Sequence, residues 1–361
     1  MKYWNRSLTV LSLSMMLIAA GCGSNASTGN NAAGNNAAGN NAAANNGESA
    51  APGASPTTPV KETLEIKTSF YPMYEFTRHV AGDLAHVENL VPAGMEPHDW
   101  EPTAQDMASI SKADVLIYNG AGMEGWVDQV VDSATGTGLK SVEASHGIEI
   151  MEGAEEESEH GEETHEDGEH AHDEGEHEES GHDHDHGGLD PHVWLSPALA
   201  IQEVRNIEKG LSEAAPQYKE QFKTNADAYV SELEALDKEY AEALKDSKRK
   251  DFITQHAAFG YLAKEYGLTQ VPIAGLSPEQ EPSAAQMAGI VKFAKEHNVK
   301  TIFFETLVSS KVADTIAKEI GAKSAVLNPI EGLTDDEIAA GLDYIGVMHQ
   351  NLEALKAALN E

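Results

Sequence analysis

The chain has 361 residues, enough for two lobes that each bury a hydrophobic core. Its formal net charge of −36 excludes the phosphate backbone as a natural partner, so we expect no nucleic-acid binding. The single cysteine leaves no pair for a disulfide within the chain, so the fold must be stable through its core alone.

The N-terminal residues predict an exported lipoprotein. A basic start at residues 1–6 precedes an apolar run at residues 8–20 that is too short to span a bilayer. We therefore expect a signal peptide over residues 1–21. Cys22 follows a glycine as in a bacterial lipobox, and its lipidation would anchor the chain to the outer face of the cell membrane. A non-lipidated signal peptide with an incidental cysteine is the alternative.

The segment after the cysteine predicts a disordered tether. Residues 22–60 repeat Gly-Asn-Asn-Ala-Ala and then become rich in Pro and Ser. With almost no aliphatic and no aromatic side chains, this segment cannot bury enough surface to fold. A tether of about 35 residues has a root-mean-square reach on the order of 30 Å.

From residue 64 onward, short apolar runs alternate with amphipathic helical segments, which is typical of parallel βαβ units. We expect an α/β protein with two βα lobes of parallel sheet, joined by one long rigid helix. The expected segments are an N-terminal lobe over residues 61–196, a helical linker over 197–248 and a C-terminal lobe over 249–361. The long amphipathic helix is predicted at residues 217–245, and a single closing helix at residues 335–359.

An acidic, histidine-rich stretch interrupts the first lobe. Residues 152–188 hold 17 acidic residues, no Lys or Arg, and 8 of the 16 histidines, without any hydrophobic period, so we expect a surface loop. We predict that it binds zinc weakly at several places; a solvated loop with no essential role is the alternative. Its histidines are His160, His165, His170, His172, His177, His182, His184 and His186.

Four isolated polar residues occupy the loops between predicted strands and helices. His98 follows a strand, His192 precedes a helix, and His256 and Glu305 each directly follow a strand. Ligands of open α/β sheets bind beyond the carboxyl ends of the strands, so these residues can converge on one cleft. Three imidazoles and one carboxylate match a tetrahedral zinc site. A lone histidine in such a loop is more often a capping or solvated residue, so spacing alone leaves each assignment open.

Several motifs carry a family resemblance. The string Asp-Pro-His-Val-Trp-Leu-Ser-Pro at residues 190–197, with residues 94–103, 254–259, 261–267 and 303–305, resembles the metal-binding segments of one protein family. This family comprises the solute-binding proteins of bacterial ABC importers for zinc and manganese. The resemblance covers nearly all of the chain from residue 64.

The resemblance implies a ligand set. In that family the matching positions imply metal ligands at His98, His192 and His256, and an acidic fourth ligand from the second lobe. Glu305 is the matching candidate for the fourth ligand, and a water molecule is the alternative. The third position is His in zinc members and Glu in manganese members, so His256 favours Zn²⁺.

The resemblance also implies a function. We expect a non-enzymatic, extracytoplasmic protein that captures Zn²⁺ and passes it to an ABC permease, as a monomer held at the membrane by Cys22. Capture of manganese or another divalent metal is one alternative, and surface adhesion is another. A zinc-dependent hydrolase is a third, but the stretch from His165 to His170 has one residue too many for H-E-x-x-H.

Deletion of residues 152–188 tests the division between the histidine-rich loop and the isolated histidines. Calorimetric titration with Zn²⁺ should retain one tight site in the deletion variant and lose the weaker sites, because only the loop binds zinc loosely. Loss of the tight site in the same titration would show that the two kinds of histidine do not act separately.

Overall fold

A computed structural model of the chain describes residues 63–153 and 188–361. Cys22, the tether and the eight histidines of the acidic stretch lie outside the described residues. Within them, no helix is long and apolar enough to cross a membrane.

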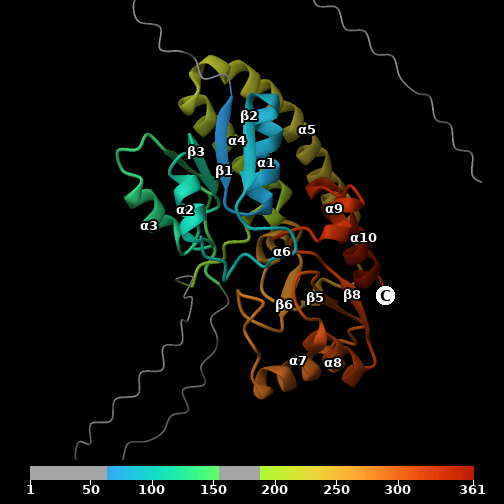
Figure 1. Cartoon of the computed structure of the whole chain (residues 1–361). Coiled ribbons are helices and arrows are strands. Elements are labelled where there is room, and N and C mark those ends of the chain that lie inside the picture. Colours follow the sequence, from blue (N-terminus) through green and yellow to red (C-terminus); the bar gives the residue numbers. More distant parts are fainter. Residues whose placement is uncertain (1–62, 154–187) are drawn as a thin grey trace, which may run out of the picture. The chain divides into compact units, whose positions relative to one another are not determined.

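The first lobe is built on a four-stranded parallel sheet with strand order β2-β1-β3-β4 (Figure 1). Its helices follow the strands, as the alternating pattern predicts. The elements are β1 (Leu64–Thr68), α1 (Tyr71–Ala81), β2 (Ala85–Asn89), α2 (Ala104–Ile110), β3 (Val115–Tyr118), α3 (Val127–Ser133) and β4 (Lys140–Glu143), with 3₁₀ turns at Gly82–Leu84 and Val193–Leu195.

The second lobe repeats this plan with strand order β6-β5-β7-β8, again all parallel. Its elements are β5 (Asp251–Thr254), α6 (Gly260–Glu265), β6 (Thr269–Pro272), α7 (Ala284–Glu296), β7 (Thr301–Phe304), α8 (Lys311–Ile320), β8 (Lys323–Val326), α9 (Asp335–Ala339) and α10 (Tyr344–Leu359). The two-sheet α/β architecture expected from the sequence is confirmed.

Two helices join the lobes: α4 (Pro197–Ala214) and, after a 3₁₀ turn at Pro216–Tyr218, α5 (Lys219–Leu244). The 26 residues of α5 span roughly 39 Å. This helix packs on α4 and α1 at one end and on α10 at the other, so it contacts elements of both lobes. The buried stripe spaced three to four residues apart consists of Phe222, Ala226, Tyr229, Leu233, Leu236, Tyr240 and Leu244. The long joining helix is therefore confirmed.

The closing segment differs from its prediction, because it forms two helices where one was expected. Gly341 adopts a left-handed conformation with φ of +73°, which ends α9. Asp343 then begins α10, since its Oδ1 accepts a hydrogen bond of 2.7 Å from the backbone N–H of Gly346. The prediction of a continuous helix over residues 335–359 was wrong at this break.

One acidic side chain lies in the core of the first lobe. Glu203 of α4 is fully buried, and neither of its carboxylate oxygens has a hydrogen-bond partner within the described residues. Burial, followed by the charge of Glu124, raises the pKa of Glu203 well above its ordinary value. The folded state therefore favours the protonated carboxyl group.

Glu203→Gln tests this assignment through the pH dependence of stability. A carboxyl whose pKa is higher in the folded than in the unfolded state stabilises less as pH rises above the unfolded value. We expect Glu203→Gln to raise Tm by about 3 °C at pH 8, with a smaller difference from the wild type at pH 5. The exposed Glu213→Gln on the same helix is the control. Equal Tm differences at both pH values for Glu203→Gln would contradict a raised pKa.

Candidate metal centre

Three imidazoles and one carboxylate meet between the lobes. The Nε2 atom of His192 lies 3.3 Å from that of His98 and 3.2 Å from that of His256. Oε1 of Glu331 lies 3.2 Å from each of these three nitrogens. All four residues are buried, and their ligand atoms lie within 4.8 Å of one another.

These distances fit one small ion. A tetrahedral ion with ligand bonds of about 2.0 Å has edges of about 3.3 Å between its ligand atoms. The measured separations of 3.2–3.3 Å match such edges, so the side chains stand at corners around a common centre. Three nitrogens and one oxygen are a donor set that zinc accepts in four-coordinate sites.

The four side chains come from four separate loops. His98 lies between β2 and α2, and His192 immediately precedes the 3₁₀ turn that leads into α4. His256 follows β5, and Glu331 lies between β8 and α9. Three of the four loops begin at the carboxyl end of a strand, which is where open α/β sheets bind ligands. The structure thus brings together the three histidines that the sequence singles out.

Glu305 lies beside this cluster instead of within it. Its Oε1 is 2.6 Å from Nδ1 of His256 and also accepts the backbone N–H of His256 at 3.2 Å. Strand β7, which ends at the residue before Glu305, pairs directly with β5, so this carboxylate meets the outer face of the His256 ring. Glu331 occupies the position next to the three Nε2 atoms, where the sequence placed Glu305 or water.

Sequence reasoning missed Glu331. It lies in an irregular stretch after β8, five residues beyond the strand end at Val326, so no direct strand-to-ligand spacing marks it. The one sequence feature that could have pointed to Glu331 is that it is an acidic residue in a loop after a predicted strand of the second lobe. Glu305 carries the same signal more strongly, because it comes directly after its strand.

A second carboxylate holds His192. Oδ1 of Asp190 is 2.8 Å from Nδ1 of His192 and accepts its backbone N–H at 3.0 Å. Asp190 and Glu305 therefore accept the Nδ1–H of two rings, so in the neutral tautomer of each ring the lone pair is on Nε2, which faces the centre. This tautomer is the one in which a neutral imidazole binds a metal through Nε2.

The environment shifts the pKa values of the three imidazoles in different directions. Burial lowers the pKa of His98 to about 4. Burial also tends to lower the pKa of His192, but the hydrogen bonds from its ring to two carboxylates outweigh this effect and raise the pKa. For His256 the charges of Glu305 and Glu331 likewise outweigh burial, and the pKa lies well above its ordinary value.

The two nearby acids respond to the same charges. Burial tends to raise the pKa of Glu331. The imidazoles outweigh burial and hold this pKa well below its ordinary value, and the charge of His256 contributes most. Glu96 accepts the backbone N–H of His98 at 3.0 and 3.1 Å. Burial and then the charge of Glu331 raise the pKa of Glu96 to about 8. Glu331 is thus the carboxylate that stays ionised at the centre.

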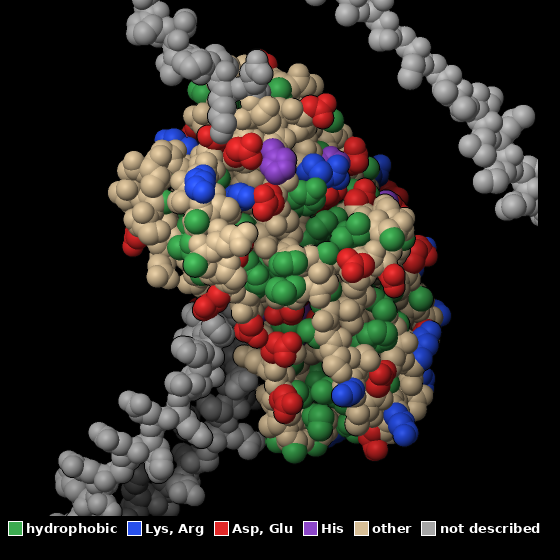
Figure 2. Space-filling model, viewed as in Figure 1, with side chains coloured by type: hydrophobic (Ala, Val, Ile, Leu, Met, Phe, Trp, Pro, Cys, Tyr) green, Lys and Arg blue, Asp and Glu red, His purple; other side chains and the backbone are tan. Residues whose placement is uncertain are grey.

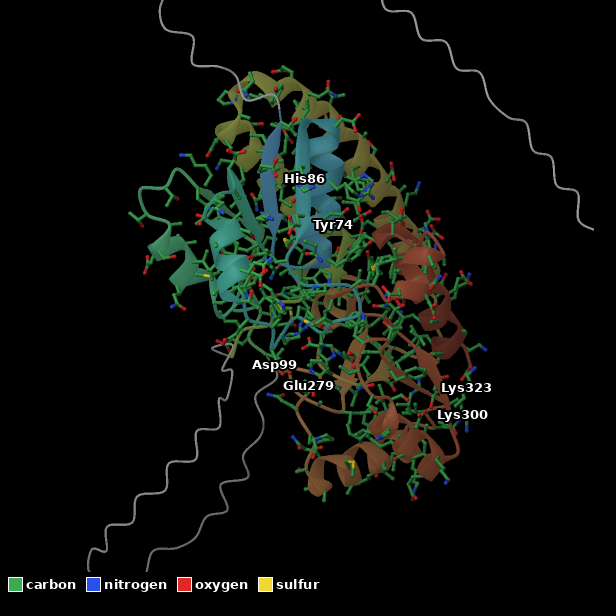
Figure 3. The ribbon with its side chains drawn as sticks, viewed as in Figure 1. Tyr74, His86, Asp99, Glu279, Lys300 and Lys323 are labelled. Carbon is green, nitrogen blue, oxygen red and sulfur yellow. The ribbon has the colours of Figure 1, made fainter. Side chains whose placement is uncertain are left out.

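A cavity of about 390 Å³ borders the centre at Glu331 and is lined by residues of both lobes. Tyr74 of α1, labelled in Figure 3, lines it from the first lobe, and Leu342 from the second. His98, His192 and His256 are not part of this lining. Figure 2 shows more acidic than basic side chains on the face it draws, which favours the approach of cations.

The shifted imidazoles predict proton release when a divalent cation binds. A metal needs neutral imidazoles, and the pKa of His256 is raised well above its ordinary value and that of His192 is raised, so metal binding must displace protons from the centre. Calorimetry in two buffers of different ionisation enthalpy should give at least about one proton released per cation, with affinity rising as pH rises. A binding enthalpy that is the same in both buffers would contradict the raised pKa values.

Comparisons with known proteins agree with this geometry. The chain matches the family model described as "Zinc-uptake complex component A periplasmic" over residues 66–358. It is 52% identical over 298 residues to the high-affinity zinc uptake system protein ZnuA of Bacillus subtilis, covering 82% of this chain and 88% of that protein.

Two further relatives come from Streptococcus pneumoniae. The zinc-binding lipoprotein AdcA of serotype 4 is 46% identical over 301 residues, and the match covers 82% of this chain but only 56% of AdcA. The chain therefore spans little more than half the length of AdcA. The crystal structure of the Zn(II)-bound ZnuA-like domain of AdcA superposes with a TM-score of 0.68 at 42% identity, covering 83% of this chain and 100% of that domain.

Proposed function

The chain belongs to the family of periplasmic zinc-uptake components, and from this membership we propose that it captures Zn²⁺ outside the cytoplasm for an ABC importer. The observation that carries the proposal is the buried cluster of three Nε2 atoms and one carboxylate oxygen at tetrahedral spacing. The family consists of metal-binding transport proteins, so the chain is not an enzyme.

We assign the ligands as His98, His192, His256 and Glu331. The convergence of their four atoms supports this set, with Glu331 in the place first expected for Glu305. Asp190 and Glu305 then act on the ion through the rings that they orient, which raises the basicity of the ligating nitrogens. The anionic Glu331 also offsets one of the two charges of the ion inside a buried site.

The donor set favours zinc over manganese. Three imidazole nitrogens and one oxygen suit a borderline-soft, four-coordinate ion, whereas manganese prefers harder, oxygen-rich sites of higher coordination number. A side chain in the fourth position also argues against a hydrolase, because catalytic zinc sites keep that position for water. Capture of Zn²⁺ is therefore favoured over both alternatives.

The relatives' names support the proposed partner and location. ZnuA is named as part of a zinc uptake system and AdcA as a lipoprotein, which supports delivery to an ABC permease from a membrane-anchored position. Cys22 is the proposed site of the lipid anchor, on the glycine-cysteine motif alone. Surface adhesion stays an alternative to this function.

Alanine substitutions separate the ligands from the residues that orient them. We expect His192→Ala and Glu331→Ala to weaken Zn²⁺ binding by more than about 100-fold, and Glu305→Ala by about 10- to 100-fold, since outer partners of ligands usually contribute that much. Competition with a chelating dye measures each Kd. The control is His349→Ala, an exposed histidine paired with Glu239.

Two outcomes would contradict this assignment. A larger loss of affinity in Glu305→Ala than in Glu331→Ala would make Glu305 the fourth ligand. Unchanged Zn²⁺ affinity in His192→Ala would show that this centre is not the site of Zn²⁺ capture. The loss should appear for Zn²⁺ without a matching gain for Mn²⁺, because neither variant adds oxygen donors.

A further inference from the structure

We propose that Trp194 is a positioning residue that holds Glu331 in the metal centre by fixing the Pro329–Ile330 peptide from the opposite lobe. Trp194 touches no ion in this scheme. Its ring also contacts that of His192, at a centroid distance of 5.2 Å, and the proposed action is the separate one through the chain that carries Glu331. The inference rests on the proposed function, because it concerns the fourth ligand assigned there.

Trp194 joins the two lobes at two points. It lies fully buried in the 3₁₀ turn two residues after His192, with its ring packed edge-on against Phe70 at a centroid distance of 4.9 Å. Its indole Nε1–H donates to the carbonyl oxygen of Pro329 in the second lobe at 2.8 Å. Its own carbonyl oxygen accepts from the hydroxyl of Tyr344 at the start of α10, at 2.5 Å.

The peptide between Pro329 and Ile330 is held at both of its polar atoms. Its oxygen accepts from Trp194, and its N–H donates to Oδ1 of Asn328 at 2.7 Å. Two hydrogen bonds on opposite sides of one peptide plane fix the rotation of that plane. The orientation of the plane in turn sets the φ angle of Ile330.

That φ angle is unfavourable. Ile330 has φ of +58°, in the left-handed region that a β-branched residue rarely adopts. Such a conformation costs on the order of 1–3 kcal/mol and persists only where the surroundings over-determine it. Ile330 directly precedes Glu331, so the strained residue sets the direction in which the chain presents the fourth ligand.

The other end of this segment is anchored within the second lobe. The backbone N–H of Asn328 donates to Oδ1 of Asn351 at 2.8 Å, and Nδ2 of Asn351 donates to the carbonyl oxygen of Asn328 at 2.7 Å. Asn351 belongs to α10, so this anchor does not depend on the first lobe. The hydrogen bond from Trp194 to Pro329, in contrast, exists only while the first lobe is in place.

A coupling between lobe closure and metal ligation follows. When the lobes are together, Trp194 fixes the peptide plane and the strained Ile330 holds Glu331 beside the three imidazoles. When the lobes separate, the hydrogen bond to Pro329 breaks and nothing from the first lobe opposes relaxation of Ile330. Glu331 then leaves the centre, so separation of the lobes both parts the histidines and withdraws the only anionic ligand.

Trp194→Phe removes the indole N–H and keeps an aromatic ring against Phe70. We expect the dissociation rate of Zn²⁺ to rise about tenfold in stopped-flow measurements with a chelator, as for other residues that orient a ligand. In a Glu331→Ala background the same substitution should change the rate by less than twofold, because the group it positions is gone. Trp126→Phe, which alters an edge-on contact with Trp100 inside the first lobe, is the matched control.

The double-mutant cycle separates the possible outcomes. An equal increase from Trp194→Phe in both backgrounds would mean that Trp194 acts through its contact with His192 or on the fold in general, and would overturn the proposal. No increase in either background would overturn it as well. If Glu331→Ala itself leaves the dissociation rate of Zn²⁺ unchanged, the outcome contradicts the assignment of Glu331 as a ligand, on which the role of Trp194 rests. Should Trp194→Phe not fold, Trp194→benzothienylalanine replaces the N–H with sulfur in the same two-ring shape and carries the same expectation.

Discussion

The structure depends on one arrangement, in which two carboxylates fix the outer nitrogens of two imidazoles so that the inner nitrogens share a centre. Asp190 and Glu305 accept Nδ1–H from His192 and His256, and both rings then present Nε2 to Glu331 and His98. Without these partners, buried rings could rotate or carry the proton on the other nitrogen. The two lobes supply one such pair each, so each contributes a pre-oriented nitrogen before any ion arrives.

Burial explains why so many polar residues surround so small a site. A buried carboxylate without partners is costly, and Glu331 is stabilised as an anion by three imidazoles around one oxygen. Burial first, and then the charges of His192 and His256, lower the pKa of His98, so the three imidazoles do not all stay protonated next to one another. A divalent cation resolves this conflict, since it replaces protons on the rings and supplies the positive charge that Glu331 requires.

The fold and most of the centre could be predicted from the sequence because they depend on local patterns. Alternating strand and helix periods give two parallel sheets, and their carboxyl ends mark His98 and His256 as candidates without coordinates. His192 precedes a helix instead, and the motif at residues 190–197 with its family resemblance singles it out. The fourth acidic position could not be predicted, because Glu305 and Glu331 both follow strands. Which carboxylate reaches Nε2 depends on strand pairing between β5 and β7 and on the left-handed Ile330, and neither is visible in sequence. The break at Gly341 was missed because helical periodicity continues on both sides of it.

The central claim is that His98, His192, His256 and Glu331 form one tetrahedral zinc shell. X-ray absorption at the zinc edge, measured on the full-length protein with one equivalent of Zn²⁺, tests it most directly. The account predicts three imidazole nitrogens and one carboxylate oxygen at about 2.0–2.2 Å, and loss of the carboxylate oxygen from that shell in Glu331→Ala. A shell with fewer than three imidazoles, or one unchanged by Glu331→Ala and altered by Glu305→Ala, would contradict it.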